Sequence, residues 1–429
     1  MQKCIKGRSL KANEIKFRFM FLGFMLLLSN QVSVSTCYEY KHQSSPPSLA
    51  FNGLTRDYWP TEGWQVSTPT AQNMKKTRLD EMSAYIEKEG FAIDSILIIR
   101  NGYIVFEQYL SPEHNQSSLH SIFSCTKSVL SALTGIAIEK GYIEGVDQNI
   151  LDFFPNQIFA NPDPRKEDIK IKHLLTMTSG LDWHEFDVSY DDPNNSFAQL
   201  VTSTNWVQYV LDRPMVADPG EIWNYNTGDF HLLAALLQNA TGLPTGDFAI
   251  NSLATPMGIV DVFWQTDPQG INFGGSGLEL TPRSMAKFGF LYLNNGTWDR
   301  QQLVPKDWVV SSTSSYSSID TTTDYCYGWW RKPNLHTYYA LGYAGQLIYV
   351  VPQYDLVVVF TSFEETHWPY NDLLVQYVFS SLEKDADPLF SIDRLMLAVV
   401  VVVLILVLGF VIIRRKRAHH DLFLEKTSK

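Results

Sequence analysis

The chain contains two blocks with the hydrophobic pattern of β-strands, and a helical pattern precedes the first. Apolar residues recur at helical spacing from Leu79 until Gly90, and glycine is typical of a helix C-cap. The runs 95–99 and 103–109 are β-rich and flank Asn101-Gly102, a pair that favours a two-residue hairpin turn. This block therefore predicts a helix followed by an antiparallel hairpin.

The second block lies far downstream, at 346–351 and 356–361, and precedes a predicted helix over 371–382. Between the blocks, residues 124–300 are predicted to be mainly helical, because apolar positions recur there in helical stripes. The simplest assembly is an α/β (α+β) fold, in which both blocks join one antiparallel β-sheet flanked by helices, with a helical insertion domain between them. One stripe contains Val129, Leu130, Leu133, Ile136 and Ala137, and another spans residues 231–239.

Both ends of the chain predict membrane targeting. Residues 395–413 form an uncharged apolar run long enough for a transmembrane helix across the ~30 Å hydrocarbon layer, followed by a basic cytoplasmic tail at 414–429. Residues 1–36 have the order of a signal peptide or signal anchor, with a basic stretch before a short apolar one. We therefore expect a single-pass membrane protein whose large domain is extracellular or extracytoplasmic and whose C-terminus is cytoplasmic.

An extracytoplasmic domain would be open to two modifications, one if its compartment is oxidising and the other if the host has glycosylation machinery. One is a Cys37–Cys326 disulfide, for which the sequence supplies no geometry. The other is N-glycosylation at acceptor motifs. The cysteines form no C-x-x-C pair and no Cys/His group with zinc-ligand spacing, so we expect no metal site. The acceptor motifs begin at Asn115, Asn194, Asn239 and Asn295.

Charge disfavours one class of partner. Residues 19–392 carry 41 acidic and 21 basic side chains. Such an acidic domain repels phosphate backbones, so we expect no nucleic-acid binding. The whole chain is 45% hydrophobic and 13% aromatic, which is enough apolar material for one large core or two modest ones.

The tetrapeptide Ser124-Cys-Thr-Lys127 has the spacing of a serine nucleophile and its base. Serine is a poor nucleophile at neutral pH, so it needs a base within hydrogen-bond reach and donors for the oxyanion. Residues i and i+3 share one helix face, and a helix N-terminus offers free N–H groups to developing negative charge. The ten residues after Lys127 are nearly all apolar or small, and burial there would depress the lysine pKa and let it act as a base.

The chain holds two further Ser-x-x-Lys tetrapeptides in different contexts. Ser284 and Lys287 follow a Thr-Pro helix start, whereas Ser381 and Lys384 lie at the end of a helix beside acidic residues. We interpret both of these lysines as solvated. The predicted chemistry therefore belongs to Ser124.

Around Ser124 the sequence resembles the class C β-lactamase-related serine hydrolases, a penicillin-binding-protein-like family. Residues 123–141 are similar to the family's first motif, and residues 219–228 resemble the second. Further similar segments follow in the family's order, at 173–180, 274–282 and 342–346. The resemblance implies a hydrolase domain at roughly 79–383 behind an irregular leader at 37–78, with the site at the junction of sheet and helices.

The resemblance also implies roles for single residues. Ser124 corresponds to the nucleophile, Lys127 to its base, and Tyr225 to the tyrosine that relays protons between serine, lysine and leaving group. Where the family's second motif has Asn, this chain has Thr227, whose hydroxyl preserves a relay but not the usual amide contact to substrate. Trp223 is expected near the site because it lies two residues before Tyr225.

The third motif corresponds to the segment Tyr343-Ala344-Gly345, which has no basic residue to bind a substrate carboxylate. The backbone N–H of Gln346 is expected to complete an oxyanion hole with that of Ser124, because backbone donors do not depend on side-chain identity. This segment therefore favours ester or amide hydrolysis over β-lactamase action.

Other signals are set aside. His184-Glu185 lacks the second histidine of a zinc protease, and His120 is interpreted as a solvent or capping residue because Lys127 already fills the base position. Large aromatic residues are more often core than pocket lining. We therefore assign to the core Trp183, Trp206, Trp264, Trp329 and Trp330.

The sequence thus predicts an extracytoplasmic serine hydrolase that cleaves an ester or amide bond of a small molecule or peptide through a Ser124 acyl-enzyme, without cofactor or metal. A catalytically inactive membrane-tethered binding protein on the same fold is one alternative. A D-Ala-D-Ala-type peptidase or β-lactamase is the other. The intact set of Ser124, Lys127 and Tyr225 argues against the binding protein.

Overall fold

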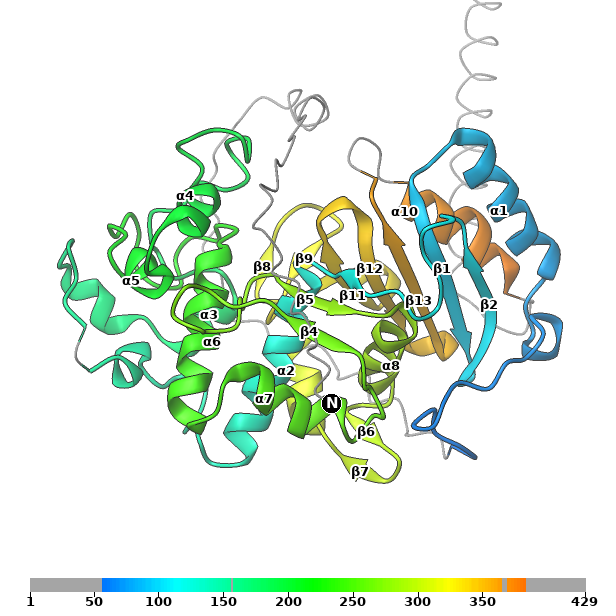
Figure 1. Cartoon of the computed structure of the whole chain (residues 1–429), viewed down its shortest axis with the longest axis horizontal. Helices are drawn as coiled ribbons and strands as arrows, with labels where there is room; N and C mark the ends of the chain where they lie inside the picture. The colour runs from blue at the N-terminus through cyan, green and yellow to red at the C-terminus, as the bar shows by residue number, and fades with distance from the viewer. Residues whose placement is uncertain (1–55, 156, 365–368, 383–429) are drawn as a thin grey trace, which may run out of the picture.

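A large antiparallel sheet forms the centre of the protein, in a computed structural model that describes residues 56–155, 157–364 and 369–382. Figure 1 shows the sheet with helices packed on it and a mainly helical region beside it. The strand order is β2-β1-β13-β12-β11-β10-β9-β8. The strands are β1 (Ile93–Arg100), β2 (Tyr103–Tyr109), β8 (Ser317–Ser318), β9 (Asp324–Tyr325), β10 (Trp330–Lys332), β11 (Thr337–Gly342), β12 (Gln346–Val351) and β13 (Leu356–Ser362).

The two blocks of β pattern meet in this sheet, as predicted. β1 pairs antiparallel with β13, so that Ile96 lies opposite Phe360 and Ile98 opposite Val358. The hairpin between β1 and β2 turns at Asn101-Gly102, where both residues have positive φ, 53° and 86°. Positive φ at both central residues is what a type I′ hairpin turn requires, which explains the Asn-Gly pair.

The sheet is covered on both faces, and alternate residues of each strand belong to different cores. Leu97 and Ile99 pack in one hydrophobic cluster with α8 (Pro282–Leu293), whereas Ile96 and Ile98 pack in another with α1 (Lys76–Glu89). Side chains of successive strand residues point to opposite faces, so a strand buried on both faces reads as a continuous apolar run. The second cluster also contains the C-terminal helical segment, α10 (Tyr370–Asp372) continued by a π-helix (Leu373–Phe379).

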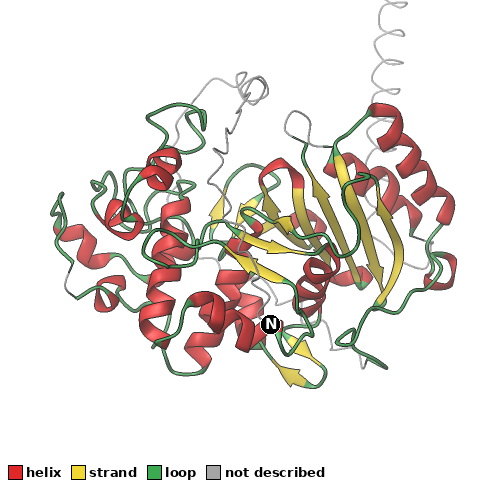
Figure 2. Ribbon diagram, in the orientation of Figure 1, coloured by secondary structure: helices red, strands yellow, loops and turns green. Residues whose placement is uncertain are grey.

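The predicted helical region 124–300 is mainly helix and loop with short strands (Figure 2). Its two longest helices are α2 (Cys125–Glu139) and α6 (Thr227–Thr241), which bury nearly all of their residues. The shorter helices are α3 (Ile171–Leu175), α4 (Ser196–Thr202), α5 (Trp206–Leu211), α7 (Thr245–Ala249) with a π-helical turn (Ile250–Ala254), and later α9 (Lys306–Ser312). The strands are β3 (His120–Ser121), β4 (Val262–Trp264) and β5 (Leu278–Leu280) in one small sheet, and β6 (Thr297–Trp298) with β7 (Gln301–Gln302) in a hairpin.

The structure corrects the predicted location. Among the described residues, no helix has both the length and the apolar composition needed to cross a bilayer, which overturns the single-pass topology. The apolar helices α2 and α6 have only 15 residues each, about 22 Å of helix, and their apolar surface is buried inside the protein. The segments behind that prediction, 1–36, 395–413 and 414–429, lie outside the described residues.

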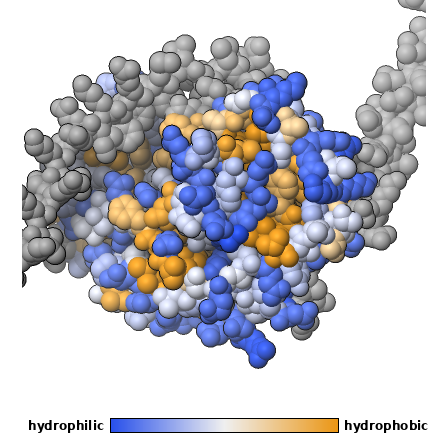
Figure 3. Space-filling view, turned by 45° about the vertical axis from the view of Figure 1, so that its right-hand side comes forward, coloured by the Kyte–Doolittle hydropathy of each residue, from blue (hydrophilic) through white to orange (hydrophobic). Residues whose placement is uncertain are grey.

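Hydrophobic and hydrophilic side chains are mixed on the surface of the protein (Figure 3). Figure 3 shows hydrophobic residues in patches between hydrophilic ones on one face of the molecule. Single exposed apolar side chains are ordinary on folded proteins, because polar residues are too few to cover the whole surface. The most exposed large examples among the described residues are Val260 and Ile158.

The structure also corrects the interpretation of Lys287 as a solvated lysine. Lys287 is buried in α8, and its Nζ donates to the carbonyl oxygens of Met257 at 2.9 Å and Gly258 at 2.8 Å. Burial lowers the pKa of Lys287 to about 8. The prediction failed because α8 packs between the sheet and these loops, which its sequence does not reveal. Lys384 lies outside the described residues.

The close packing around Gly135 in α2 can be tested by substitution. A Cβ added to Gly135 would lie 2.3 Å from the ring of Trp308. Gly135→Ala gains about 1 kcal/mol of helix propensity, but it forces the indole to move, and we expect a net loss of about 2 kcal/mol in the free energy of unfolding by urea denaturation. Gly145→Ala, where a Cβ meets nothing within 4 Å, is the control. Equal stability of the two variants would contradict the packing described.

Candidate active site

Ser124 lies at the N-terminus of α2, in contact with both partners that the sequence assigned to it. Its Oγ accepts hydrogen bonds from Nζ of Lys127 at 2.9 Å and from the hydroxyl of Tyr225 at 2.7 Å. Phe123, directly before it, has a φ of +44°, an unfavourable backbone conformation for a bulky residue. Such local strain persists where surrounding structure enforces it, and it often marks functional sites.

The amine of Lys127 is enclosed by oxygen atoms from separate segments. Besides Ser124, Nζ donates to the carbonyl oxygen of Gly275 at 2.7 Å and to Oγ1 of Thr227 at 3.1 Å. Lys127 is 1% exposed, and its Nζ lies 4.9 Å from the ring centre of Tyr225. Burial lowers the pKa of Lys127 to about 8, although the negative charge of Glu185 opposes this shift. About a tenth of the amine is therefore neutral at pH 7, far more than for an ordinary lysine.

Tyr225 precedes α6 and is also buried. Burial raises the pKa of its phenol, and the nearby charge of Glu185 raises it further. The hydroxyl thus keeps its proton over the neutral range and donates it to Ser124. Lysine and tyrosine together hold the serine oxygen from two directions, as a proton relay requires.

Glu185 is a member of this site that the sequence did not identify. Its buried carboxylate accepts hydrogen bonds from the hydroxyl of Thr227 at 2.8 Å, from the Thr227 N–H at 3.0 Å, and from Nε1 of Trp183 at 2.7 Å. The Thr227 hydroxyl therefore donates to Glu185 and accepts from Lys127. A continuous path of hydrogen bonds joins Glu185, Thr227, Lys127 and Ser124. Glu185 was considered only in a zinc-protease motif, and nothing in its spacing pairs it with a residue 42 positions away.

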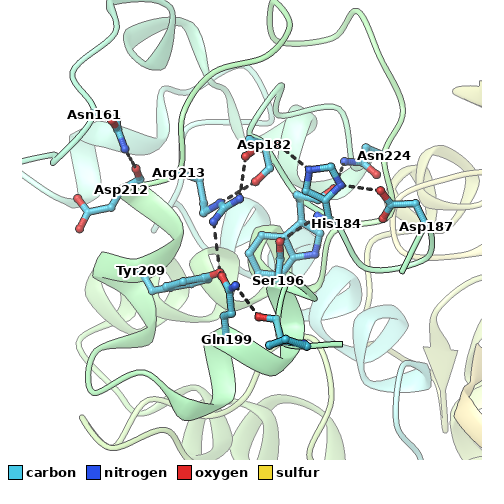
Figure 4. A network of polar contacts seen from close by, with 12 residues as sticks. Asn161, Asp182, His184, Asp187, Ser196, Gln199, Tyr209, Asp212, Arg213 and Asn224 are labelled. Atoms are coloured by element: carbon cyan, nitrogen blue, oxygen red, sulfur yellow. Dashed lines mark hydrogen bonds and ion pairs between the residues drawn. The ribbon is translucent and has the colours of Figure 1, made fainter. Parts of the chain in front are cut away.

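The loop that carries Glu185 is held by a separate polar network (Figure 4). Arg213 donates to the carboxylate of Asp182 at 2.8 Å and to its backbone carbonyl at 2.7 Å. The side chain of Asn224 donates to the carbonyl oxygen of Trp183 at 2.7 Å. Since Asn224 directly precedes Tyr225, this bond links the Glu185 loop to the tyrosine. These contacts hold the segment directly before Glu185 and so help to position its carboxylate.

The segment matched to the third motif and Gln346 after it contact the two neighbours of Ser124 in the chain, Phe123 and Cys125. Tyr343–Gly345 forms a tight turn between β11 and β12, and the ring of Tyr343 is 5.4 Å from that of Phe123. Gly345 has a φ of +92°, and a Cβ there would collide with the hydroxyl of Tyr370 at 1.6 Å, so only glycine fits. Gln346 begins β12, and its carbonyl oxygen lies 3.5 Å from Sγ of Cys125. The turn therefore sits against the first residue of α2.

Aromatic rings cover Tyr225. Trp223 is 6.4 Å from it, as the sequence led us to expect. Phe186 stacks on Tyr225 at 4.0 Å with an interplanar angle of 9°, and Trp330 stacks at 6.4 Å. Phe186 is 51% exposed, so an apolar ring reaches solvent beside the buried Tyr225. Trp330 was assigned to the core and lies at the site instead, whereas the other four core tryptophans are buried as expected: Trp183, Trp206, Trp264 and Trp329.

Two further expectations concern residues near the site. His120 is buried and not exposed to solvent, in contrast to its interpretation as a solvent or capping residue. Cys125 and Cys326 are buried free thiols, and burial raises the pKa of both. Cys37 lies outside the described residues, so the Cys37–Cys326 disulfide stays a prediction.

Comparison with known proteins agrees with the motifs. The profile of the beta-lactamase family matches residues 80–366. The 6-aminohexanoate-dimer hydrolase of Paenarthrobacter ureafaciens is 22% identical over 326 residues, which cover 68% of this chain and 76% of that protein.

Two solved structures show the same fold. EstCE1, a hydrolase with promiscuous acyltransferase activity, aligns with a TM-score of 0.61 at 16% identity and covers 72% of this chain and all of its own (100%). A family VIII carboxylesterase aligns with a TM-score of 0.57 at 14% identity and covers 74% of this chain and 99% of its own. At such identities the similarity concerns the fold alone.

The environment of Lys127 can be tested without a substrate. In protein labelled with ¹³C at the lysine ε-carbon, Lys127 is expected to titrate near pH 8. Glu185→Gln removes the negative charge that opposes the effect of burial, so the Lys127 pKa should fall further. Glu144→Gln, a change at an exposed glutamate outside this site, should leave the titration unchanged. A Lys127 that titrates near 10.5 in wild-type protein would show that its amine is solvated.

Proposed function

The chain belongs to the beta-lactamase family of hydrolases, and from this premise we propose that it is a serine hydrolase that cleaves an ester or amide bond through an acyl-enzyme on Ser124. One observation carries the proposal: the Ser124 hydroxyl lies within hydrogen-bond distance of both Lys127 and Tyr225. The proposed hydrolase domain is 79–383, and the family match at 80–366 supports it.

In the proposed reaction, neutral Lys127 accepts the proton of Ser124 as the serine oxygen attacks the substrate carbonyl. The N–H groups of Ser124 and Gln346 stabilise the oxyanion, because one stands at the start of α2 and the other at the start of β12 against it. Tyr225 donates its phenolic proton to the leaving group and regains a proton from Lys127. Water, deprotonated by the same relay, then attacks the acyl group and frees Ser124.

The surroundings of Ser124 favour an ester or amide with an apolar group next to the scissile bond. Phe186, Trp223 and Trp330 surround Tyr225 with aromatic surface. Apolar and aromatic linings with few polar groups are typical of small-molecule sites. The turn Tyr343–Gly345 contributes no positive charge, which argues against a carboxylate-bearing peptide or β-lactam. The contacts of Ser124 argue against a protein that binds without turnover.

A covalent probe tests the nucleophile. A fluorophosphonate should label wild-type protein with one equivalent, and Ser124→Ala should abolish labelling. Ser284→Ala is a matched control, because Ser284 begins the second buried Ser-x-x-Lys tetrapeptide yet hydrogen-bonds only within the turn at Thr281 among the described contacts. Intact-mass measurement and peptide mapping give the stoichiometry and the site. Unlabelled wild-type protein, or labelling that survives in Ser124→Ala, would refute the proposed nucleophile.

The pH dependence tests the base. Because the proposed active form carries a neutral Lys127 with a pKa of about 8, kcat/KM for a neutral ester should rise with pH and level off above that value. Below it, the rate should fall about tenfold for each pH unit. Tyr225 adds no loss on the alkaline side up to about pH 10, because its pKa is raised. A kcat/KM that is constant between pH 6 and 9 would contradict the role of Lys127.

A further inference from the structure

Two histidines and an aspartate from three segments meet at the end of β1 nearest its N-terminus. Asp94 lies in β1, His114 in the loop after β2, and His120 in β3. Nδ1 of His114 is 3.2 Å from one carboxylate oxygen of Asp94, and Nδ1 of His120 is 3.8 Å from the other. One donor atom from each of the three side chains lies within 4.8 Å of the others. The proposed hydrolysis uses none of them.

Hydrogen bonds do not account for this cluster. The distance of 3.8 Å between His120 and Asp94 exceeds a hydrogen bond. Among the described residues, the buried Nε2 of His120 has no hydrogen-bond partner, and Nδ1 of His114 has the carboxylate of Asp94 beside it at 3.2 Å. The side chain of His120 is only 5% exposed, and an imidazole so buried normally has its nitrogens satisfied. His120 thus has one buried ring nitrogen without a hydrogen-bond partner, and its other ring nitrogen faces the carboxylate of Asp94 at 3.8 Å.

We propose that Asp94, His114 and His120 bind a divalent transition-metal ion, with zinc as the best match. Zinc takes imidazole nitrogen and carboxylate oxygen in tetrahedral geometry at about 2.0–2.1 Å, which places neighbouring donors about 3.3 Å apart. The distances of 3.2 and 3.8 Å run to different oxygens of Asp94, and one donor atom from each side chain lies within 4.8 Å of the others, so rotations of the side chains must bring the three donors to that spacing. Three protein ligands leave the fourth position for water.

The chemistry of the three groups suits a soft-to-borderline cation. Imidazole ligands bind metal ions through the lone pair of a neutral ring, and two imidazoles with one carboxylate supply nitrogen and oxygen donors that suit zinc. Besides Asp94 itself, Glu113 is an acidic group near enough for its charge to act on Asp94, and its negative charge also attracts a cation. Mg²⁺ and Ca²⁺ prefer sets of oxygen ligands, so two imidazoles select against them.

Such an ion would tie β1 to the segment that leads into Ser124. His120 lies four residues before Ser124, and β3 pairs with β5 of the small sheet. The ion would therefore join β1 of the large sheet, the loop at His114 and the segment that leads into α2. Its expected effect is structural: it fixes the segment before the strained Phe123.

Metal binding to the purified full chain tests this inference independently of hydrolysis. After treatment with a chelator and dialysis, wild-type protein should take up one equivalent of Zn²⁺, and Co²⁺ in its place should give the visible absorption of a tetrahedral site. The melting temperature should rise with Zn²⁺, because an ion that binds only the folded state stabilises it. His114→Asn, at a partly exposed ligand that folding tolerates more readily than His120, should weaken binding by at least about 100-fold.

His336→Asn is the matched control, since His336 has a φ of +51°, a conformation that asparagine accepts, and lies outside the cluster. This control should bind Zn²⁺ as the wild type does. If wild-type protein binds no stoichiometric Zn²⁺ or Co²⁺, or if His114→Asn binds as tightly as His336→Asn, the cluster is only an imidazole–carboxylate contact and the inference fails. The fluorophosphonate experiment is unaffected by either result.

Discussion

The amine of Lys127, buried against the hydroxyl of Ser124, is the contact on which the architecture of this protein depends. An amine without water needs acceptors for its hydrogens, and here they come from Ser124, Thr227 and Gly275. These residues belong to the start of α2, the start of α6 and the loop before β5. The lysine is therefore satisfied only when the helical region has folded against the small sheet, so that folding and assembly of the site are the same event.

Two opposing electrostatic effects balance at this amine. Burial alone would drive the lysine far toward its neutral form, whereas the carboxylate of Glu185 favours the charged form. Thr227 stands between them and replaces the asparagine of the related motif with a hydroxyl that both donates and accepts. The threonine at this position is matched by a buried glutamate, because the Glu185 carboxylate accepts the hydrogen bond of the Thr227 hydroxyl. The polar network around Asp182 and Arg213 holds the loop that carries that glutamate.

The sheet contributes to the site through one turn whose shape leaves little freedom. Gly345 fits beneath the hydroxyl of Tyr370 only because it lacks a side chain, and Gln346 reaches Cys125 at the start of α2. Four residues before Ser124, the cluster of Asp94, His114 and His120 would join the same sheet to β3 through the proposed ion. With that ion bound, the proposed nucleophile would be held by two connections to the large sheet, which suits a group that must keep its geometry through catalysis.

The sequence by itself determined the local elements and the candidate site residues. The hairpin at Asn101-Gly102 and the union of the two β blocks in one antiparallel sheet follow from periodicity and turn chemistry, and the candidates Ser124, Lys127 and Tyr225 follow from spacing and ordered motifs. Only the tertiary structure decided what surrounds them: that Glu185 reaches Thr227, that Phe186 and Trp330 lie on Tyr225, and that His120 and Lys287 are buried. Periodicity reports which face of an element is apolar, but a contact between residues far apart in the chain depends on how complete elements pack, and no local pattern records that.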